Sequence, residues 1–184
     1  MNFYIDVFYK FHAICIIPIN KIKKKEKNLY NLIPIQWQLI LTNEGSFTQT
    51  LTYLTSQIIK IKVLQTKNKT DQRNIRCVWL ETEIYTKLTF ARSLWLLINE
   101  HKTIETYKPI GQSFIQNKTD IYKKIDEIYY GYSKDLEQNF NLNQPIWGRK
   151  YTLYYKNKSS VTIQEFFSPY ILYFFTKNKK VNYL

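Results

Sequence analysis

The chain has 184 residues and a formal net charge of +13 at pH 7. A chain of this length can bury a core of its own as one domain, and its 45% of hydrophobic residues excludes an intrinsically disordered protein. Lys outnumbers Arg 23 to 4, and A/T-rich codons encode Lys, Ile, Asn and Tyr, so coding bias accounts for much of the charge. Because a phosphate-binding protein is expected to use more Arg, we expect no nucleic-acid partner.

The cysteines, histidines and apolar runs exclude further classes. Cys15 and Cys77 are flanked by apolar residues, which favours small hydrophobic thiols in a reducing compartment over a disulfide framework. His12 and His101 stand alone, so no metal site is predicted. Residues 11–19 form an apolar run shorter than the roughly 20 residues of a membrane span. We also find no signal-peptide pattern and expect the protein to work where it is made.

Residues 1–33 are predicted to form an N-terminal arm. Residues 1–20 are apolar and strand-like, and Lys21–Lys27 is a basic run. We interpret the basic run as a solvated loop, with contact to a polyanion as the alternative.

Two helices are predicted next. Pro34 suits the first turn of a helix over residues 34–41. Ser46 is the predicted N-cap of a helix over residues 47–54, because Gln49 completes a capping box with it.

From residue 58 the hydrophobic period changes to two, which is typical of strands with one wet face. The predicted strands cover residues 58–63, 75–83, 86–97, 147–155 and 161–167. A third helix is predicted from residue 119 or 120 to Tyr130, because Ile121, Ile125 and Ile128 lie at helical spacing. Residues 133–145 are predicted to be a polar loop.

This order of elements predicts an α+β fold, with a single antiparallel β-sheet and helices inserted between its strands. We place the domain at residues 34–172 and a flexible tail at residues 173–184.

Three of the arginines are candidate site residues. Arg76, Arg92 and Arg149 lie in strand-like segments beside hydrophobic residues. In a Lys-rich chain, an Arg inside a strand is consistent with bidentate binding of a carboxylate. A structural pairing with an acidic neighbour is the simpler alternative for each. The scattered glycines exclude a Gly-rich phosphate loop.

Glu165 is the fourth candidate, because it follows Ile163 in a predicted strand and precedes two phenylalanines. If it faces the interior it needs a partner, and it could serve as an acid, a base or a hydroxyl acceptor. An outward-facing Glu fits the strand alternation equally well.

The order of several short segments resembles a known family. The segments are Gly45–Thr48, Arg76–Leu80, Phe90–Ser93, Pro109–Gly111, Trp147–Lys150 and Gln164–Pro169. Together, over roughly residues 34–172, they resemble chorismate pyruvate-lyase and the lyase-like proteins of cyanobacteria, mycobacteria and algal plastid genomes.

The resemblance implies helical flaps over an enclosed ligand site and a reaction without metal or organic cofactor. By the family pattern, Arg76 grips the ring carboxylate of chorismate, with help from the backbone amide of Ile110. Glu165 meets the ring hydroxyl, and Phe47 lines the pocket where the bacterial lyase has Met. Cys77 follows Arg76 where the bacterial enzyme has Glu.

The family pattern leaves Arg92 and Arg149 as candidate contacts to the second carboxylate of chorismate, or as structural residues. We therefore expect a chorismate pyruvate-lyase that makes 4-hydroxybenzoate for quinone ring synthesis. The alternative is a non-catalytic module that binds an aromatic acid on the same fold. We expect a monomer without a membrane span, in the plastid stroma or otherwise in a bacterial cytoplasm.

Overall fold

The computed structural model describes residues 10–19, 33–69, 73–84, 86–96, 121–155 and 158–177. Ile110, the basic run Lys21–Lys27 and the end of the predicted tail, residues 178–184, lie outside the described residues.

A seven-stranded antiparallel sheet forms the framework of the described residues. Its strands are β1 (His12–Pro18), β2 (Lys60–Lys69), β3 (Arg73–Glu81), β4 (Lys87–Leu96), β5 (Ile121–Tyr132), β6 (Ile146–Tyr155) and β7 (Lys158–Phe167). They are arranged in the order β1-β5-β6-β7-β4-β3-β2. The α+β prediction with one antiparallel sheet is confirmed.

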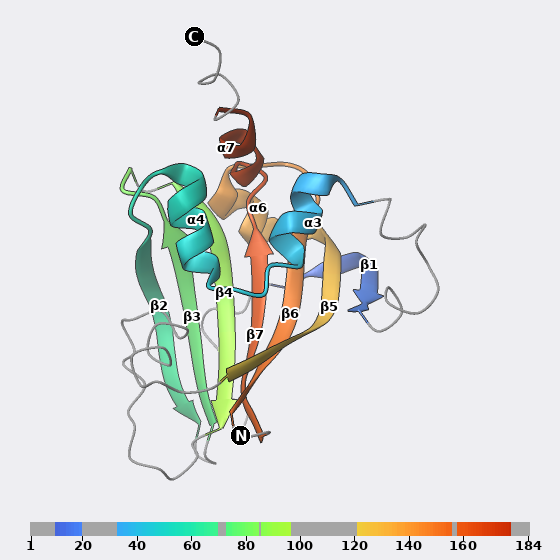
Figure 1. Cartoon of the computed structure of the whole chain (residues 1–184), viewed down its shortest axis with the longest axis vertical. Coiled ribbons are helices and arrows are strands. Elements are labelled where there is room, and N and C mark those ends of the chain that lie inside the picture. Colours follow the sequence, from blue (N-terminus) through green and yellow to red (C-terminus); the bar gives the residue numbers. More distant parts are fainter. Residues whose placement is uncertain are drawn as a thin grey trace.

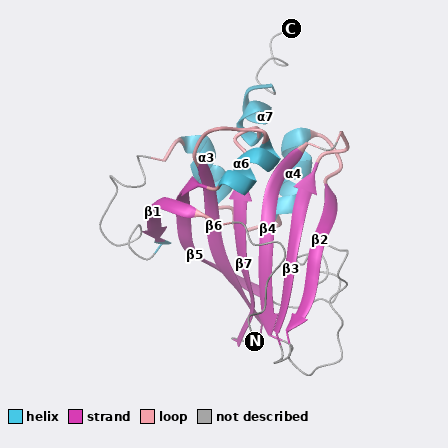
Figure 2. Ribbon diagram, turned by 180° about the vertical axis from the view of Figure 1, so that it is seen from behind, coloured by secondary structure: helices cyan, strands magenta, loops and turns pink. Residues whose placement is uncertain are grey.

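Helices gather at one end of this sheet (Figure 1). They are α3 (Ile35–Leu41), α4 (Phe47–Thr55), α6 (Lys134–Phe140) and α7 (Ile171–Lys177). Helices α3 and α4 cover one face, whereas α6 covers the other, as the view from behind shows (Figure 2).

The two faces of the sheet carry separate cores. One core joins Trp37 of α3 and Leu51 of α4 to sheet residues that include Leu80. The other core joins Leu136 of α6 to sheet residues that include Trp79. Because successive side chains of a strand point to opposite faces, neighbouring residues enter different cores. The face on which a residue lies therefore decides whether it can belong to a given site.

The helix predicted from residue 119 or 120 to Tyr130 is wrong, since this segment lies largely in strand β5. A β-bulge between Ile125 and Glu127 explains the misleading pattern. The extra residue shifts the alternation by one position, so that Ile121, Ile125 and Ile128 lie on the same face of a strand. Their spacing of four and then three residues therefore looks helical.

The polar loop predicted over residues 133–145 is also wrong, because it contains α6. Leu136 and Phe140 lie four residues apart on this helix and are both buried. The flexible tail predicted from residue 173 begins instead as part of α7, which continues to Lys177.

The predicted start of α4 is confirmed at its cap. The Ser46 hydroxyl accepts a hydrogen bond from the backbone N–H of Gln49 at 3.5 Å. Pro34, predicted as the first residue of a helix, is the N-cap residue directly before α3. Strand β1 comes from the predicted arm and pairs with β5. The domain limits at residues 34 and 172 stay predictions.

Gly148 on β6 lies tightly against β7 and supplies a test of this packing. A Cβ at this position would lie 2.7 Å from the carbonyl oxygen of Glu165 and 2.7 Å from Phe166 Cδ1. We expect Gly148→Ala to lower the free energy of unfolding by roughly 1–3 kcal/mol, measured by urea denaturation. Gly45→Ala is the matched control, because a Cβ at Gly45 meets nothing within 4 Å. Equal stability of the two variants would contradict the tight contact.

Candidate active site

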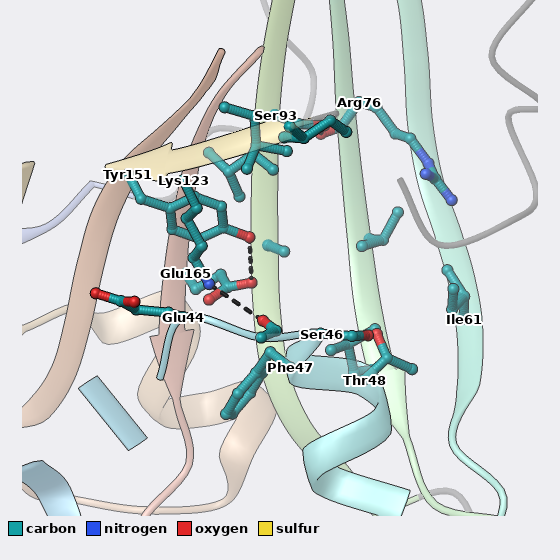
Figure 3. Close-up of a pocket in the computed structure, with 17 residues that line it drawn as sticks. Glu44, Ser46, Phe47, Thr48, Ile61, Arg76, Ser93, Lys123, Tyr151 and Glu165 are labelled. Atoms are coloured by element: carbon teal, nitrogen blue, oxygen red, sulfur yellow. Dashed lines mark hydrogen bonds between the residues drawn. The ribbon is translucent and has the colours of Figure 1, made fainter. Parts of the chain in front are cut away.

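A cavity of about 250 Å³ lies on the face of the sheet that α3 and α4 cover (Figure 3). Its apolar wall joins Phe47 and Leu80 to Leu153 and Ile163. Its polar lining consists of Glu44, Ser46, Thr48, Arg76, Ser93, Lys123, Tyr151 and Glu165. An apolar wall with a few converging polar groups is typical of a site for a small organic ligand.

Glu165 on β7 is a buried carboxylate with both oxygens bonded. Arg149 Nε donates to its Oε2 at 2.7 Å, and the Tyr151 hydroxyl donates to its Oε1 at 2.9 Å. Burial and the neighbouring Glu165 carboxylate raise the pKa of Tyr151 well above its ordinary value. The Tyr151 hydroxyl therefore stays protonated and remains a donor. The two bonds fix the orientation of Glu165 in the wall of the cavity.

Arg149 on β6 is fully buried and does not line the cavity. Its Nη1 donates to the carbonyl oxygens of Ile40 at 2.8 Å and Asn43 at 3.0 Å. Carbonyl groups at the C-terminal end of a helix lack partners within the helix and favour a nearby cation. Arg149 therefore binds the end of α3 with one nitrogen and Glu165 with another. The Arg149–Glu165 pair is thus the structural pairing with an acidic neighbour that was the simpler alternative for each arginine in the sequence.

Arg76 on β3 lines the cavity, and only 2% of the residue is exposed. Burial lowers the pKa of Arg76, but a guanidinium remains charged in proteins. Strand β4 separates β3 from β7, so Arg76 and Glu165 belong to strands about 10 Å apart. Figure 3 shows Arg76 on one side of the cavity, and Glu165 with Tyr151 on the other. Arg76 thus supplies a guanidinium on one side of the cavity, and Glu165 supplies a carboxylate on the other.

Lys123 on β5 lies in the same wall as Glu165 (Figure 3). Its Nζ donates to the carbonyl oxygen of Asn43 at 2.9 Å and lies 4.2 Å from the ring centroid of Tyr151. Burial lowers the pKa of Lys123 to about 7; Arg149 lowers it as well, whereas Glu165 and Glu44 raise it. At neutral pH a large share of this lysine is therefore the uncharged amine.

Lys123 is not among the site residues predicted from the sequence, because the predicted helix from residue 119 or 120 to Tyr130 includes it. In a strand, Ile121, Lys123 and Ile125 lie on the same face. A Lys between two inward-facing isoleucines is a sequence signal for a polar residue in a cavity wall.

Arg92 lies on the other face of the sheet. Its Nη2 donates to Gln164 Oε1, and Gln164 Nε2 donates to the Tyr129 hydroxyl at 3.3 Å. Phe166, the neighbour of Glu165, packs in the core of that same face. Arg92 is therefore separated from the cavity by the sheet itself.

The candidate residues of the sequence thus divide into groups. Phe47, Arg76 and Glu165 line one cavity. Arg149 does not line it, but donates a hydrogen bond to the Glu165 carboxylate. Arg92 lies on the opposite face, and Ile110 lies outside the described residues.

Within the described ranges, no three His, Cys, Asp or Glu side chains gather as a metal site would need. In the same part of the chain, no helix is long and apolar enough to cross a membrane.

The fold and the cavity define an α+β protein with one antiparallel sheet and a cavity whose walls carry charged groups. Residues 41–175 match the family described as Chorismate pyruvate-lyase Rv2949c-like. The chain belongs to this family.

Relatives of the chain carry the name uncharacterized protein ycf21. The relative from Antithamnion sp. is 46% identical over 83% of this chain and 89% of its own length. The relative from Porphyra purpurea is 40% identical over 74% and 83%, and that from Cyanophora paradoxa is 32% identical over 76% and 80%.

Among solved structures, the C-terminal domain of a histidine utilization repressor from Pseudomonas syringae aligns with a TM-score of 0.40 and 7% identity. The alignment covers 61% of this chain and 92% of that domain. A likeness at this level carries no functional assignment.

Arg149 gives a test of the support behind the site. Arg149→Met leaves the buried Glu165 carboxylate without its cation, so we expect the free energy of unfolding to fall by about 3–5 kcal/mol. The double variant Arg149→Met with Glu165→Leu should regain part of this loss, because no unpaired charge is left. Lys150→Met is the control, since Lys150 forms a half-exposed pair with Glu127 at 3.5 Å. A loss of similar size in the control would refute a special role for the buried pair.

Proposed function

We propose that the chain is a chorismate pyruvate-lyase, which eliminates pyruvate from chorismate and leaves 4-hydroxybenzoate. The observation that carries the proposal is a single cavity with buried Arg76 on one side and the oriented carboxylate of Glu165 on the other. Family membership supports the same reaction class.

In this proposal the ring of chorismate lies between the two sides of the cavity. Arg76 binds the ring carboxylate through its planar fork, and the backbone amide of Ile110 is a second donor to that group. Glu165 accepts a hydrogen bond from the ring hydroxyl, while Arg149 and Tyr151 keep its carboxylate in place.

The second carboxylate of chorismate belongs, in this proposal, beside Ser46 and Thr48, which line the cavity at the start of α4. The N-terminus of a helix favours negative charge, and both hydroxyls can donate. Arg92 and Arg149 are less suitable, because neither lines the cavity.

The elimination needs no strong nucleophile, because loss of pyruvate makes the ring aromatic. The protein has to hold chorismate in a reactive orientation and keep water away. Phe47 and the aliphatic residues of the wall supply the apolar surface for the ring.

Relatives occur in algal plastids, so we propose that the protein works in the plastid stroma. There, 4-hydroxybenzoate would enter quinone ring synthesis. We further propose that the protein acts as a monomer.

The proposal is tested by incubating the purified protein with chorismate and measuring 4-hydroxybenzoate and pyruvate by chromatography. We expect both products in equal amounts. Arg76→Ala and Glu165→Gln should each lower kcat/KM by about a hundred-fold or more, because each removes a group that orients the substrate. Arg92→Lys is the control and should retain activity, because Arg92 lies on the other face of the sheet.

Activity that survives both cavity substitutions would keep the reaction and refute the site. A folded wild-type protein that binds 4-hydroxybenzoate tightly but releases no product would instead be the binding module that the sequence left open.

A further inference from the structure

Lys123 is held in place by the linker between α3 and α4. Its Nζ donates to the carbonyl oxygens of Asn43 at 2.9 Å and Gly45 at 3.4 Å. Arg149 also donates to the carbonyl oxygen of Asn43, at 3.0 Å. The linker thus places a primary amine in the wall of the cavity, where Figure 3 shows it beside Glu165 and Tyr151.

These contacts can be made by the uncharged amine as well as by the ammonium. A neutral amine has two N–H bonds and one lone pair, and the two carbonyl groups accept both N–H bonds. The remaining tetrahedral direction is the lone pair, which is the part of the amine that accepts a proton. The Tyr151 ring, 4.2 Å from Nζ, covers one side of the amine.

The charged and titratable groups around Lys123 come from each neighbouring element. Arg149 and Tyr151 belong to β6, Glu165 belongs to β7, and Glu44 belongs to the linker. Burial is the main cause that brings the pKa of Lys123 to about 7, followed by the repulsion of Arg149. A general base is most effective when its pKa lies near the working pH.

We propose that Lys123 is a catalytic residue of the lyase reaction, whose Nζ takes the proton from the ring carbon that carries the hydroxyl group. This inference rests on the proposed function. It follows from the place of Lys123: if Glu165 binds the ring hydroxyl, the amine beside Glu165 lies next to the carbon that must lose its proton.

The proton and electron movements balance. The C–H bond at the hydroxyl-bearing carbon breaks, and its proton passes to Nζ. Its electron pair forms the new double bond to the neighbouring carbon, which completes the aromatic ring. The bond from that neighbouring carbon to the ether oxygen breaks, and the pair leaves with enolpyruvate. The ammonium then gives the proton to the methylene carbon of enolpyruvate, which forms pyruvate and restores the amine.

The test compares the pH dependence of chorismate turnover in wild type, Lys123→Met and Lys123→Arg. For the wild type we expect kcat/KM to rise with pH through about 7, the pKa of Lys123 in the free protein. The corresponding rise in kcat reports the pKa of Lys123 in the complex with chorismate. It should lie at higher pH, because the bound dianion stabilises the ammonium. Both variants should lose about a hundred-fold or more in kcat and lose the rising limb.

Lys123→Arg separates chemistry from positioning. An Arg at this position can still donate to the linker carbonyls, but it stays charged and cannot accept a proton. If Lys123 only positions the linker or the substrate, Lys123→Arg should recover most of the activity, and the proposal is overturned. Lys124→Met is the matched control, since the Lys124 side chain is 57% exposed and absent from the cavity wall.

A second readout does not need activity. Because the pKa of Lys123 is lowered in the folded protein, the wild type carries a stability penalty below pH 7. The penalty is relieved as pH rises from about 7 toward the ordinary lysine pKa of 10.5. The stability of Lys123→Met relative to wild type, measured by urea denaturation, should therefore be higher at pH 6 than at pH 9. A difference independent of pH would contradict the lowered pKa of Lys123.

The outcomes separate this inference from the proposed function. If the folded wild type makes no 4-hydroxybenzoate, both fail. If the wild type is active and Lys123→Met keeps its rate and pH profile, the lyase stands and the role of Lys123 is refuted.

Discussion

The site depends on one buried guanidinium. Arg149 is covered completely by protein, and three of its neighbours are the end of α3, the linker to α4 and the carboxylate of Glu165. A cation in this position would be costly without these partners. The end of α3, the linker that holds Lys123 and the carboxylate in the cavity wall are therefore placed by the same side chain.

The second organising constraint is the alternation of side chains along each strand. On β3, Arg76 faces the cavity and Cys77 faces the opposite core. On β4, Ser93 faces the cavity, whereas Arg92 belongs to a hydrogen-bonded row on the far side. The two arginines looked alike in the sequence, because each lies in an apolar strand. Only the pairing of the strands separates a cavity residue from a residue of the other face.

The sequence was informative where local chemistry decides the structure. Ser46 and Pro34 identified helix starts, and strand alternation identified most of the sheet. The site residues Arg76 and Glu165 came from the family resemblance, since alternation alone left Glu165 open to either face. The sequence was misleading at β5, where the bulge imitates a helical period. Lys123 could not be identified as a site residue without that strand, because the groups around its amine come from Asn43, β6 and β7, which are distant in the sequence.

The bulge in β5 also affects how the chain can change its length. It gives β5 one residue more than β6 between Ile125 and Glu127. A single-residue deletion in this stretch can be absorbed when the bulge straightens, and Lys123 then keeps its face. An inserted residue cannot be absorbed in this way. It would turn the side chain of either Lys123 or Ile128 to the opposite face of the sheet. During evolution, this strand can therefore shorten by one residue more easily than it can lengthen.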